Sequence, residues 1–330
     1  MFTEQIMHEH PTMIKALMGI PAELYWAIVN VANRILPEID HERLARPDRQ
    51  RQSGAGRAYD QPIALRVAAL LTYLRLHAPQ IAVGVMYGVN QTDISRDLRR
   101  LLPAIQKALP CPEVWKVMES GQSRSAAEQI KLEELADGRV LVDATEQRVS
   151  RAKDNETRKK YYSGKKKQFT IKTQLVTDGE HHIRAISEGI PGAEHDKALS
   201  DELHTLERLP DGCEAELDKG YQGVEKQVDL VTVVDPKTGE AQEIPRLTVK
   251  IPYKKPKKGE LTEEQRLFNA QVSAIRVRVE HCIGWVKNWA ILANRFRCAH
   301  SVYTPIMCTI CGLVNLQTET WQTSIGANSA

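Results

Sequence analysis

Three carboxylates stand at positions that suit metal-dependent phosphoryl transfer. Asp143 lies in the strand pattern VLVDAT, Asp218 ends the strand pattern AELDKGY, and Glu280 lies in the helical pattern AIRVRVEHCIGWVK. A carboxylate that closes an apolar strand is costly unless it has a partner. Oxygen ligands suit magnesium, and carboxylates can hold two ions about 3.5–4 Å apart. Together the three acids predict a two-metal site that binds Mg²⁺, with Mn²⁺ as a substitute.

Two cations bracket Glu280 on the predicted helix. At about 100° per residue, Arg276, Glu280 and Lys287 share one narrow stripe, and the apolar stripe lies to one side of it. Arg276 and Lys287 could therefore neutralise DNA phosphates beside the site. The alternative is a ladder of surface salt bridges on a solvated helix. Acids in strands next to turns are also common, so each aspartate taken alone could be an ordinary structural residue with no role in catalysis.

The net charge of +3 hides a strong segregation along the chain. Residues 41–110 have a net charge of +6, residues 151–172 of +7, and residues 173–247 of −10. Basic blocks of this kind predict a polyanionic partner. In the second block, Tyr161 and Tyr162 lie between two groups of lysines close to the first aspartate, which favours nucleic acid contact over a solvated hairpin. The lysines expected to touch DNA are Lys165, Lys166 and Lys167.

A pair of helices in the N-terminal part could read DNA. The pattern predicts a short helix over about 79–87, a turn at 88–90 with Asn90 as N-cap, and a second helix over about 91–102. Such a pair is typical of a helix-turn-helix, whose second helix enters the major groove. An amphipathic hairpin with a solvated basic face is the alternative. The outward side chains that we expect to contact DNA are Gln91, Thr92, Ser95, Arg96 and Arg99.

The remaining elements would position the carboxylates. Three β-rich runs follow one another from residue 139 to 190 and predict an antiparallel meander. A helical stretch over 196–209, the strand CEAELD, a β-rich patch over 230–253 and a long helix over about 262–292 come next. Another helix is expected near 305–320. The fold class is therefore α/β, a mixed sheet flanked by helices, preceded by an all-helical domain.

Composition excludes several classes of protein. With 42% hydrophobic and 26% charged residues, the chain is neither disordered nor collagen-like nor a coiled coil. Six cysteines are too sparse for a disulfide scaffold, and we expect the pair Cys308 and Cys311 to be buried and structural. The first 20 residues do not read as a signal peptide, and the charge-free stretch 301–318 is too polar for a membrane span. We therefore expect a cytoplasmic protein with reduced thiols.

A family resemblance follows from specific stretches of sequence. These are VDATE at Asp143, YYSGKKKQFTIKTQLV at 161–176, GIPGAEHDKAL at 189–199, LDKGYQG at 217–223, IPYKKPKKGELT at 251–262 and RVRVEHCIGWVK at 276–287. On them, the chain from Val140 to Asn315 resembles the DDE transposases of bacterial insertion sequences, in the insertion-sequence-five family, and the related Harbinger-type endonucleases. The family's helix signature is Tyr-x₂-Arg-x₃-Glu-x₆-Lys, and here Ser273 stands in the tyrosine position. His195-Asp196 matches the family's His-Asp element, which we expect to cap the following helix.

The resemblance implies both a fold and an activity. The fold is RNase H-like, with a helix-turn-helix domain over 1–125 (the motif at about 62–109) and a catalytic domain over 126–330 that carries a β-rich insertion at about 229–260. Asp143, Asp218 and Glu280 would be the catalytic and metal-binding triad.

The implied reaction cleaves DNA at the ends of a mobile element and joins the freed 3′-OH to target DNA. The implied partners are double-stranded DNA, as terminal inverted repeats and as target, and further copies of the chain, with no membrane involved and the nucleoid as the place of action. Two alternatives remain: a metal-dependent endonuclease without strand transfer, and a domesticated helix-turn-helix protein that only binds DNA.

Overall fold

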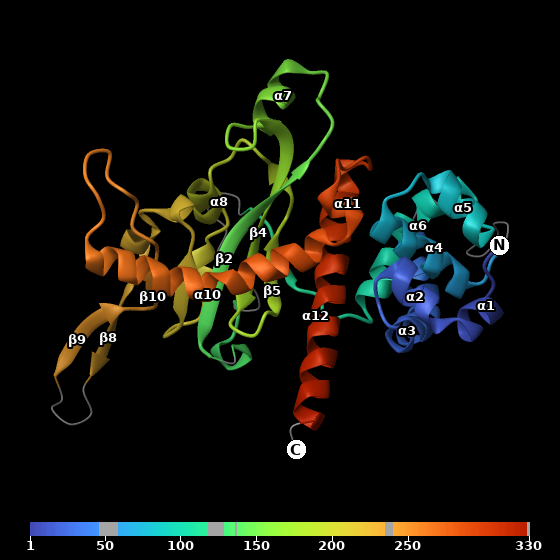
Figure 1. Ribbon diagram of the computed structural model, residues 1–330, viewed down its shortest axis with the longest axis horizontal. Helices are drawn as coiled ribbons and strands as arrows, with labels where there is room; N and C mark the ends of the chain where they lie inside the picture. The colour runs from blue at the N-terminus through green and yellow to red at the C-terminus, as the bar shows by residue number, and fades with distance from the viewer. Residues whose placement is uncertain (46–58, 118–128, 136, 235–239, 329–330) are drawn as a thin grey trace. The chain divides into compact units, whose positions relative to one another are not determined.

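The computed structural model describes residues 1–45, 59–117, 129–135, 137–234 and 240–328 (Figure 1). By contacts, the chain divides into two compact units. One contains Met1–Cys111 with Trp285–Ala330, and the other is Pro112–Gly284. The predicted domain boundary at residue 125 lies outside the described residues, and the C-terminal helices expected in the catalytic domain pack with the N-terminal ones.

The unit over Pro112–Gly284 is built on an eight-stranded mixed sheet (Figure 1). The main path runs β1 (Glu113–Trp115), β5 (Ile183–Ser187), β4 (Gln168–Asp178), β2 (Arg139–Arg148), β7 (Glu214–Leu217) and β10 (Thr248–Lys250), and β3 (Tyr162–Ser163) and β6 (Ile190–Pro191) pair with β4. The strands β2, β4 and β5 are antiparallel neighbours, which confirms the predicted meander, while β7 pairs in parallel with β2 and with β10.

Register in the centre of the sheet sets the position of the carboxylates. Val142 of β2 is paired with Leu217 of β7 in a parallel ladder. The residues that follow them are Asp143 and Asp218, which are therefore neighbours across the two strands. Because side chains alternate along a strand, Asp143 projects on the face opposite to the buried Val142. The parallel pairing therefore brings Asp143 and Asp218 to one level on one face of the sheet.

Apolar residues on the other face form the core with two helices. Alternate residues of β2 and β7, including Val142 and Leu217, pack with Leu199 of α8 (Asp196–Glu202) and Leu206 of α9 (Thr205–Arg208). The helix α10 (Glu263–Lys287) crosses β2 in Figure 1. The remaining elements of this unit are α7 (Asn155–Tyr161), the 3₁₀ helices Leu132–Glu134, Lys219–Tyr221 and Val224–Gln227, and the separate hairpin of β8 (Leu230–Val234) and β9 (Ala241–Pro245).

The other unit is helical. It contains α1 (Glu4–Glu9), α2 (Pro11–Met18), α3 (Ala22–Leu44), α4 (Ile63–Leu76), α5 (Gln80–Tyr87), α6 (Gln91–Gln106), α11 (Ala290–Ala293), the 3₁₀ turn His300–Val302 and α12 (Tyr303–Asn328). The α4 helix is its centre, with every residue from 64 to 74 buried. Among the described residues, no single helix is long and apolar enough to cross a membrane, and α2 and α3 reach that length only together across a 78° bend.

The turn between α5 and α6 depends on two glycines. Gly88 has a φ of 67°, a left-handed conformation that favours glycine. A Cβ at Gly84 would lie 2.4 Å from the carbonyl oxygen of Val89, so only glycine lets the turn fold back this closely. Asn90 takes the N-cap position as predicted, but its side chain makes no capping hydrogen bond.

The predicted end of the second helix at residue 102 is wrong. The helix α6 continues through Pro103 to Gln106. Buried Ala104 and Ile105 pack in the unit's interior, and this packing outweighs the hydrogen bond that proline removes.

Candidate active site

Arg276 joins the two predicted catalytic aspartates. Its Nη2 lies 2.9 Å from Oδ2 of Asp143, and its Nη1 lies 3.1 Å from Oδ1 of Asp218. The Arg276 side chain is buried, and its Nε has no hydrogen-bond partner within the described parts of the chain. A guanidinium that serves two carboxylates at once holds them as a pair, because its planar donors fit carboxylate oxygens well.

The environment of Asp143 disfavours its ionised form. Burial raises the pKa of Asp143 to about 6, although the charge of Arg276 and a hydrogen bond from the backbone N–H of Ala144, at 2.7 Å, act in the opposite direction. The nearby carboxylates of Asp218 and Asp196 raise it further. A carboxylate crowded by others in a partly dry site is typical of functional centres.

Glu280 lies apart from the two aspartates in this conformation. It is exposed on α10, one turn beyond Arg276. Within the described ranges, no three His, Cys, Asp or Glu residues form a group that could hold a metal ion. The structure therefore brings together two members of the predicted triad and leaves the third at the surface.

The two aspartates nevertheless fit a divalent cation. Carboxylate oxygens are the ligands that Mg²⁺ and Mn²⁺ prefer. Oxygens of Asp143 and Asp218 each lie about 3 Å from nitrogens of one guanidinium, which acts as a stand-in cation. The pair could accept a metal ion where Arg276 now binds.

A second ion pair, which no sequence pattern predicted, lies beside the aspartates. Lys172 of β4 is 4% exposed and donates to Oδ1 of Asp196 at 2.7 Å and to the carbonyl oxygen of Glu194. Asp196 is the first residue of α8 and belongs to the His-Asp element, but it binds this lysine, and His195 takes the N-cap position without a side-chain bond. The available signal was a lysine within an otherwise buried strand.

Gly220 and Tyr221 complete the surroundings of Asp196. A Cβ at Gly220 would lie 2.7 Å from Oδ2 of Asp196. Tyr221 is fully buried in the core, and burial together with the charges of Asp143, Asp196 and Asp218 raises the pKa of its hydroxyl well above its usual value. The motif LDKGYQG thus supplies a carboxylate, a close backbone approach and a core anchor within four residues.

The predicted lysines lie on exposed chain near this site. Lys165, Lys166 and Lys167 follow β3 in the turn before β4, and all three are exposed. Nζ of Lys165 lies 3.7 Å from Oδ2 of Asp196. Next to them, the ring of Tyr162 packs edge-on against Phe169 at 5.5 Å. A basic surface therefore begins within reach of the carboxylates.

Lys287, which was predicted to contact DNA phosphate, makes a hydrogen bond to the backbone of a nearby helix. Its Nζ donates to the carbonyl oxygen of Leu292 in α11 at 2.8 Å. This contact satisfies an orphan carbonyl of a short helix. The predicted role of Lys287 at DNA is not tested by this contact.

In the helical unit, the predicted DNA-reading residues Gln91, Thr92, Ser95, Arg96 and Arg99 are all exposed on α6. Arg96 pairs with Asp93 at 3.0 Å on the same face.

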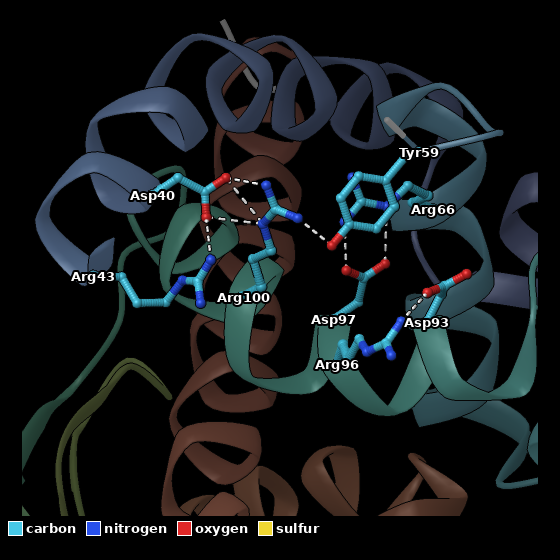
Figure 2. A network of polar contacts seen from close by, with 8 residues as sticks. All are labelled: Asp40, Arg43, Tyr59, Arg66, Asp93, Arg96, Asp97 and Arg100. Atoms are coloured by element: carbon cyan, nitrogen blue, oxygen red, sulfur yellow. Dashed lines mark hydrogen bonds and ion pairs between the residues drawn. The ribbon is translucent and has the colours of Figure 1, made fainter. Parts of the chain in front are cut away.

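The opposite face of α6 is fixed by charged contacts (Figure 2). Arg66 of α4 binds the buried Asp97 through two nitrogens, with Nε at 3.0 Å from Oδ2. Arg100 likewise donates to Asp40 of α3 through two nitrogens, Nε and Nη2. The ring of Tyr59 lies 3.4 Å below the Arg66 guanidinium. The buried pair Arg66–Asp97 and the partly buried pair Arg100–Asp40 anchor α6 and leave its outward face available.

Cys308 and Cys311 are buried in α12, as expected of a structural pair. The six cysteines are free thiols.

Comparison with known proteins gives two matches. Residues 142–315 match the model of the DDE superfamily endonucleases. The chain is also 25% identical over 279 residues to a probable transposase for insertion sequence element IS702 from Microchaete diplosiphon. The aligned region covers 83% of this chain and 87% of that protein. No solved structure is significantly similar to it. Because the family match spans more than half of the sequence and includes Asp143, Asp218 and Glu280, the chain belongs to the DDE superfamily endonucleases.

Proposed function

We propose that the protein is the transposase of a bacterial insertion sequence of the insertion-sequence-five family, related to the Harbinger-type endonucleases. It binds the ends of its element, cleaves the DNA and joins the 3′-OH ends to target DNA. The observation that carries the proposal is the pair Asp143, in the middle of β2, and Asp218, directly after the parallel neighbour β7, which share one cation. An RNase H-like catalytic domain accounts for this arrangement of strands.

Asp143, Asp218 and Glu280 are the catalytic carboxylates of this proposal. The two aspartates would hold divalent metal, Mg²⁺ with Mn²⁺ as a substitute, and Glu280 would join them when α10 or the side chain adjusts on DNA binding. When bound, the metal supplies charge stabilisation at the scissile phosphate and activation of the attacking oxygen. Arg276 keeps the aspartates at one level, and once released it can neutralise a phosphate beside them.

DNA recognition falls to two surfaces. Residues 62–109 act as a helix-turn-helix, with Gln91, Thr92, Ser95, Arg96 and Arg99 facing the duplex. The exposed lysines 165–167 hold the DNA next to the carboxylates. Pairing of two element ends would require a homo-oligomer on DNA, acting in the cytoplasm at the nucleoid.

The decisive experiment measures cleavage and strand transfer separately. Asp143→Ala, Asp218→Ala and Glu280→Ala should each abolish cleavage of a duplex that carries the element's end, in Mg²⁺ or Mn²⁺, without loss of DNA binding. Glu264→Ala is the matched control, since Glu264 is another exposed acid on the same helix. Normal cleavage by Glu280→Ala would remove it from the triad.

The products distinguish the alternatives. A precleaved end with a free 3′-OH, incubated with a plasmid, should give joined products if the protein is a transposase. Cleavage without joining would identify an endonuclease, and binding without either would identify a regulator.

A further inference from the structure

A groove of about 400 Å³ runs beside the outward face of α6. Gln91, Ser95 and Arg99 of α6 form one wall, and Gln80 at the start of α5 adds an amide. The facing wall is Arg297 with the residues that follow it, from the segment between α11 and α12. The C-terminal part of the chain therefore borders the surface that we propose to read DNA.

The charge of this groove selects an anion. Two guanidinium groups, of Arg99 and Arg297, belong to the described residues that line it, and no Asp or Glu is among those residues. The amides of Gln80 and Gln91 and the hydroxyl of Ser95 add neutral donors. A groove that combines cations with neutral donors suits phosphate oxygens.

Arg297 is held in place before any ligand arrives. Its Nη2 donates to the carbonyl oxygen of His77, and its Nε lies 3.3 Å from Nε2 of the same residue. Burial, aided by the charge of Arg297, lowers the pKa of His77 to about 4, so the imidazole is neutral near pH 7 and can accept this hydrogen bond. The contacts fix the guanidinium at the end of α4 and reduce the entropy that binding would cost.

We propose that this groove holds one phosphodiester strand of duplex DNA, with Arg297 and Arg99 on its phosphates. The proposal rests on the helix-turn-helix function proposed above and adds the C-terminal segment to the DNA interface. The groove is too small for a whole duplex, whereas a single backbone strand can enter it while α6 faces the bases. A phosphate clamp of this kind sets the register of the helix without reading sequence.

The test measures how the affinity for a fluorescein-labelled duplex of mixed sequence depends on salt. Arg297→Gln should weaken DNA binding. It should also make the negative slope of log association constant against log salt concentration less steep by about 0.9, the value for one lost phosphate contact. Arg295→Gln is the matched control, because Arg295 is exposed on the same segment but does not line the groove. The control should leave the slope unchanged.

A second measurement uses the unmodified full chain, since Arg297→Gln also removes bonds to His77. Arginines are modified with a glyoxal reagent in the presence and absence of the duplex, and the sites are located by mass spectrometry. DNA should protect Arg99 and Arg297 but not Arg295. Modification of Arg297 at the same rate with and without DNA overturns the proposal.

The experiment separates two kinds of failure. If Arg99→Gln lowers the slope and Arg297→Gln does not, the C-terminal wall is not part of the interface and this inference is wrong. If neither variant changes binding and neither arginine is protected, DNA recognition by residues 62–109 is itself wrong. Equal losses of DNA affinity for Arg297→Gln and Arg295→Gln would show that only the overall positive charge matters, which also overturns the inference.

Discussion

Arg276 binds Asp143 at 2.9 Å, so a residue expected to face phosphate is joined to a predicted metal ligand. The same guanidinium holds Asp218 at 3.1 Å. A cation in this place stabilises the two carboxylates without metal, and it would compete with any metal ion bound by the same oxygens. Catalysis would therefore require Arg276 to exchange the aspartates for DNA.

Replacing Arg276 should separate these two effects. Arg276→Gln leaves two crowded carboxylates without their cation, and we expect it to lower the free energy of unfolding by about 2 kcal/mol without metal. Because the competitor is gone, Mn²⁺ should bind the variant about tenfold more tightly, which corresponds to about 1.4 kcal/mol. Urea unfolding and calorimetric titration with Mn²⁺ measure the two quantities.

Arg278→Gln is the control for Arg276. Arg278 pairs with Asp137 at 3.4 Å at the surface, where such a pair contributes about 0–1 kcal/mol. Weaker Mn²⁺ binding by Arg276→Gln than by the unmodified protein would show that Arg276 supports metal binding instead of opposing it.

The raised pKa of Asp143 predicts a pH dependence of stability. Below its unfolded pKa of about 3.9 the group is protonated in both states, and its stabilising contribution is fully present. As pH rises toward 6, the unfolded chain ionises first and this contribution is lost, by about 2–3 kcal/mol in all. Unfolding of the metal-free protein and of Asp143→Asn, compared from pH 4 to pH 7, measures this loss as the difference between them.

Asp178 provides a control of opposite sign. Burial favours its protonated form, but hydrogen bonds from His182 and the charge of Arg184 outweigh burial and lower its pKa. Its contribution to stability is present above about pH 4 and is lost only as pH falls further, so the difference in stability between the unmodified protein and Asp178→Asn should stay constant from pH 4 to pH 7 and shrink below pH 4. Parallel pH profiles for the two variants would contradict the assignment for Asp143.

Gly220 should tolerate no side chain while Asp196 is fixed by Lys172. Gly220→Ala would place a Cβ 2.7 Å from Oδ2 of Asp196, and we expect a loss of about 1–3 kcal/mol in stability. In an Asp196→Ala background the loss should nearly vanish, because the obstructing atom is gone. Gly164→Ala is the control, since no atom lies within 4 Å of a Cβ there. Additive effects of the first two substitutions would exclude the contact.

Lys287 should affect chemistry more than stability. Lys287→Gln removes the bond to the Leu292 carbonyl, which is worth about 0.5–1.5 kcal/mol. If Lys287 also neutralises phosphate near the site, single-turnover cleavage at saturating protein should fall about tenfold or more, beyond any change in binding. An unchanged rate would leave Lys287 with only its structural role at α11.

Local sequence determined the elements and the residues that could do chemistry. Alternating apolar residues predicted β2, β4 and β5, because one face of each strand must be buried wherever the chain lies. Aspartates after apolar strands stood out because an unpaired charge there is costly. The helical period around Glu280 predicted α10 for the same local reason.

Tertiary structure decided which of these residues meet. The pairing of Val142 with Leu217 brings the two aspartates to the same level of the sheet. These two residues lie 75 positions apart in the sequence, so no local pattern encodes their register. Arg276 shares its helical stripe with Glu280, yet it turns to the aspartates while Glu280 stays exposed. Periodicity fixes the direction of a side chain around its own helix, whereas its partner depends on what packs against that helix.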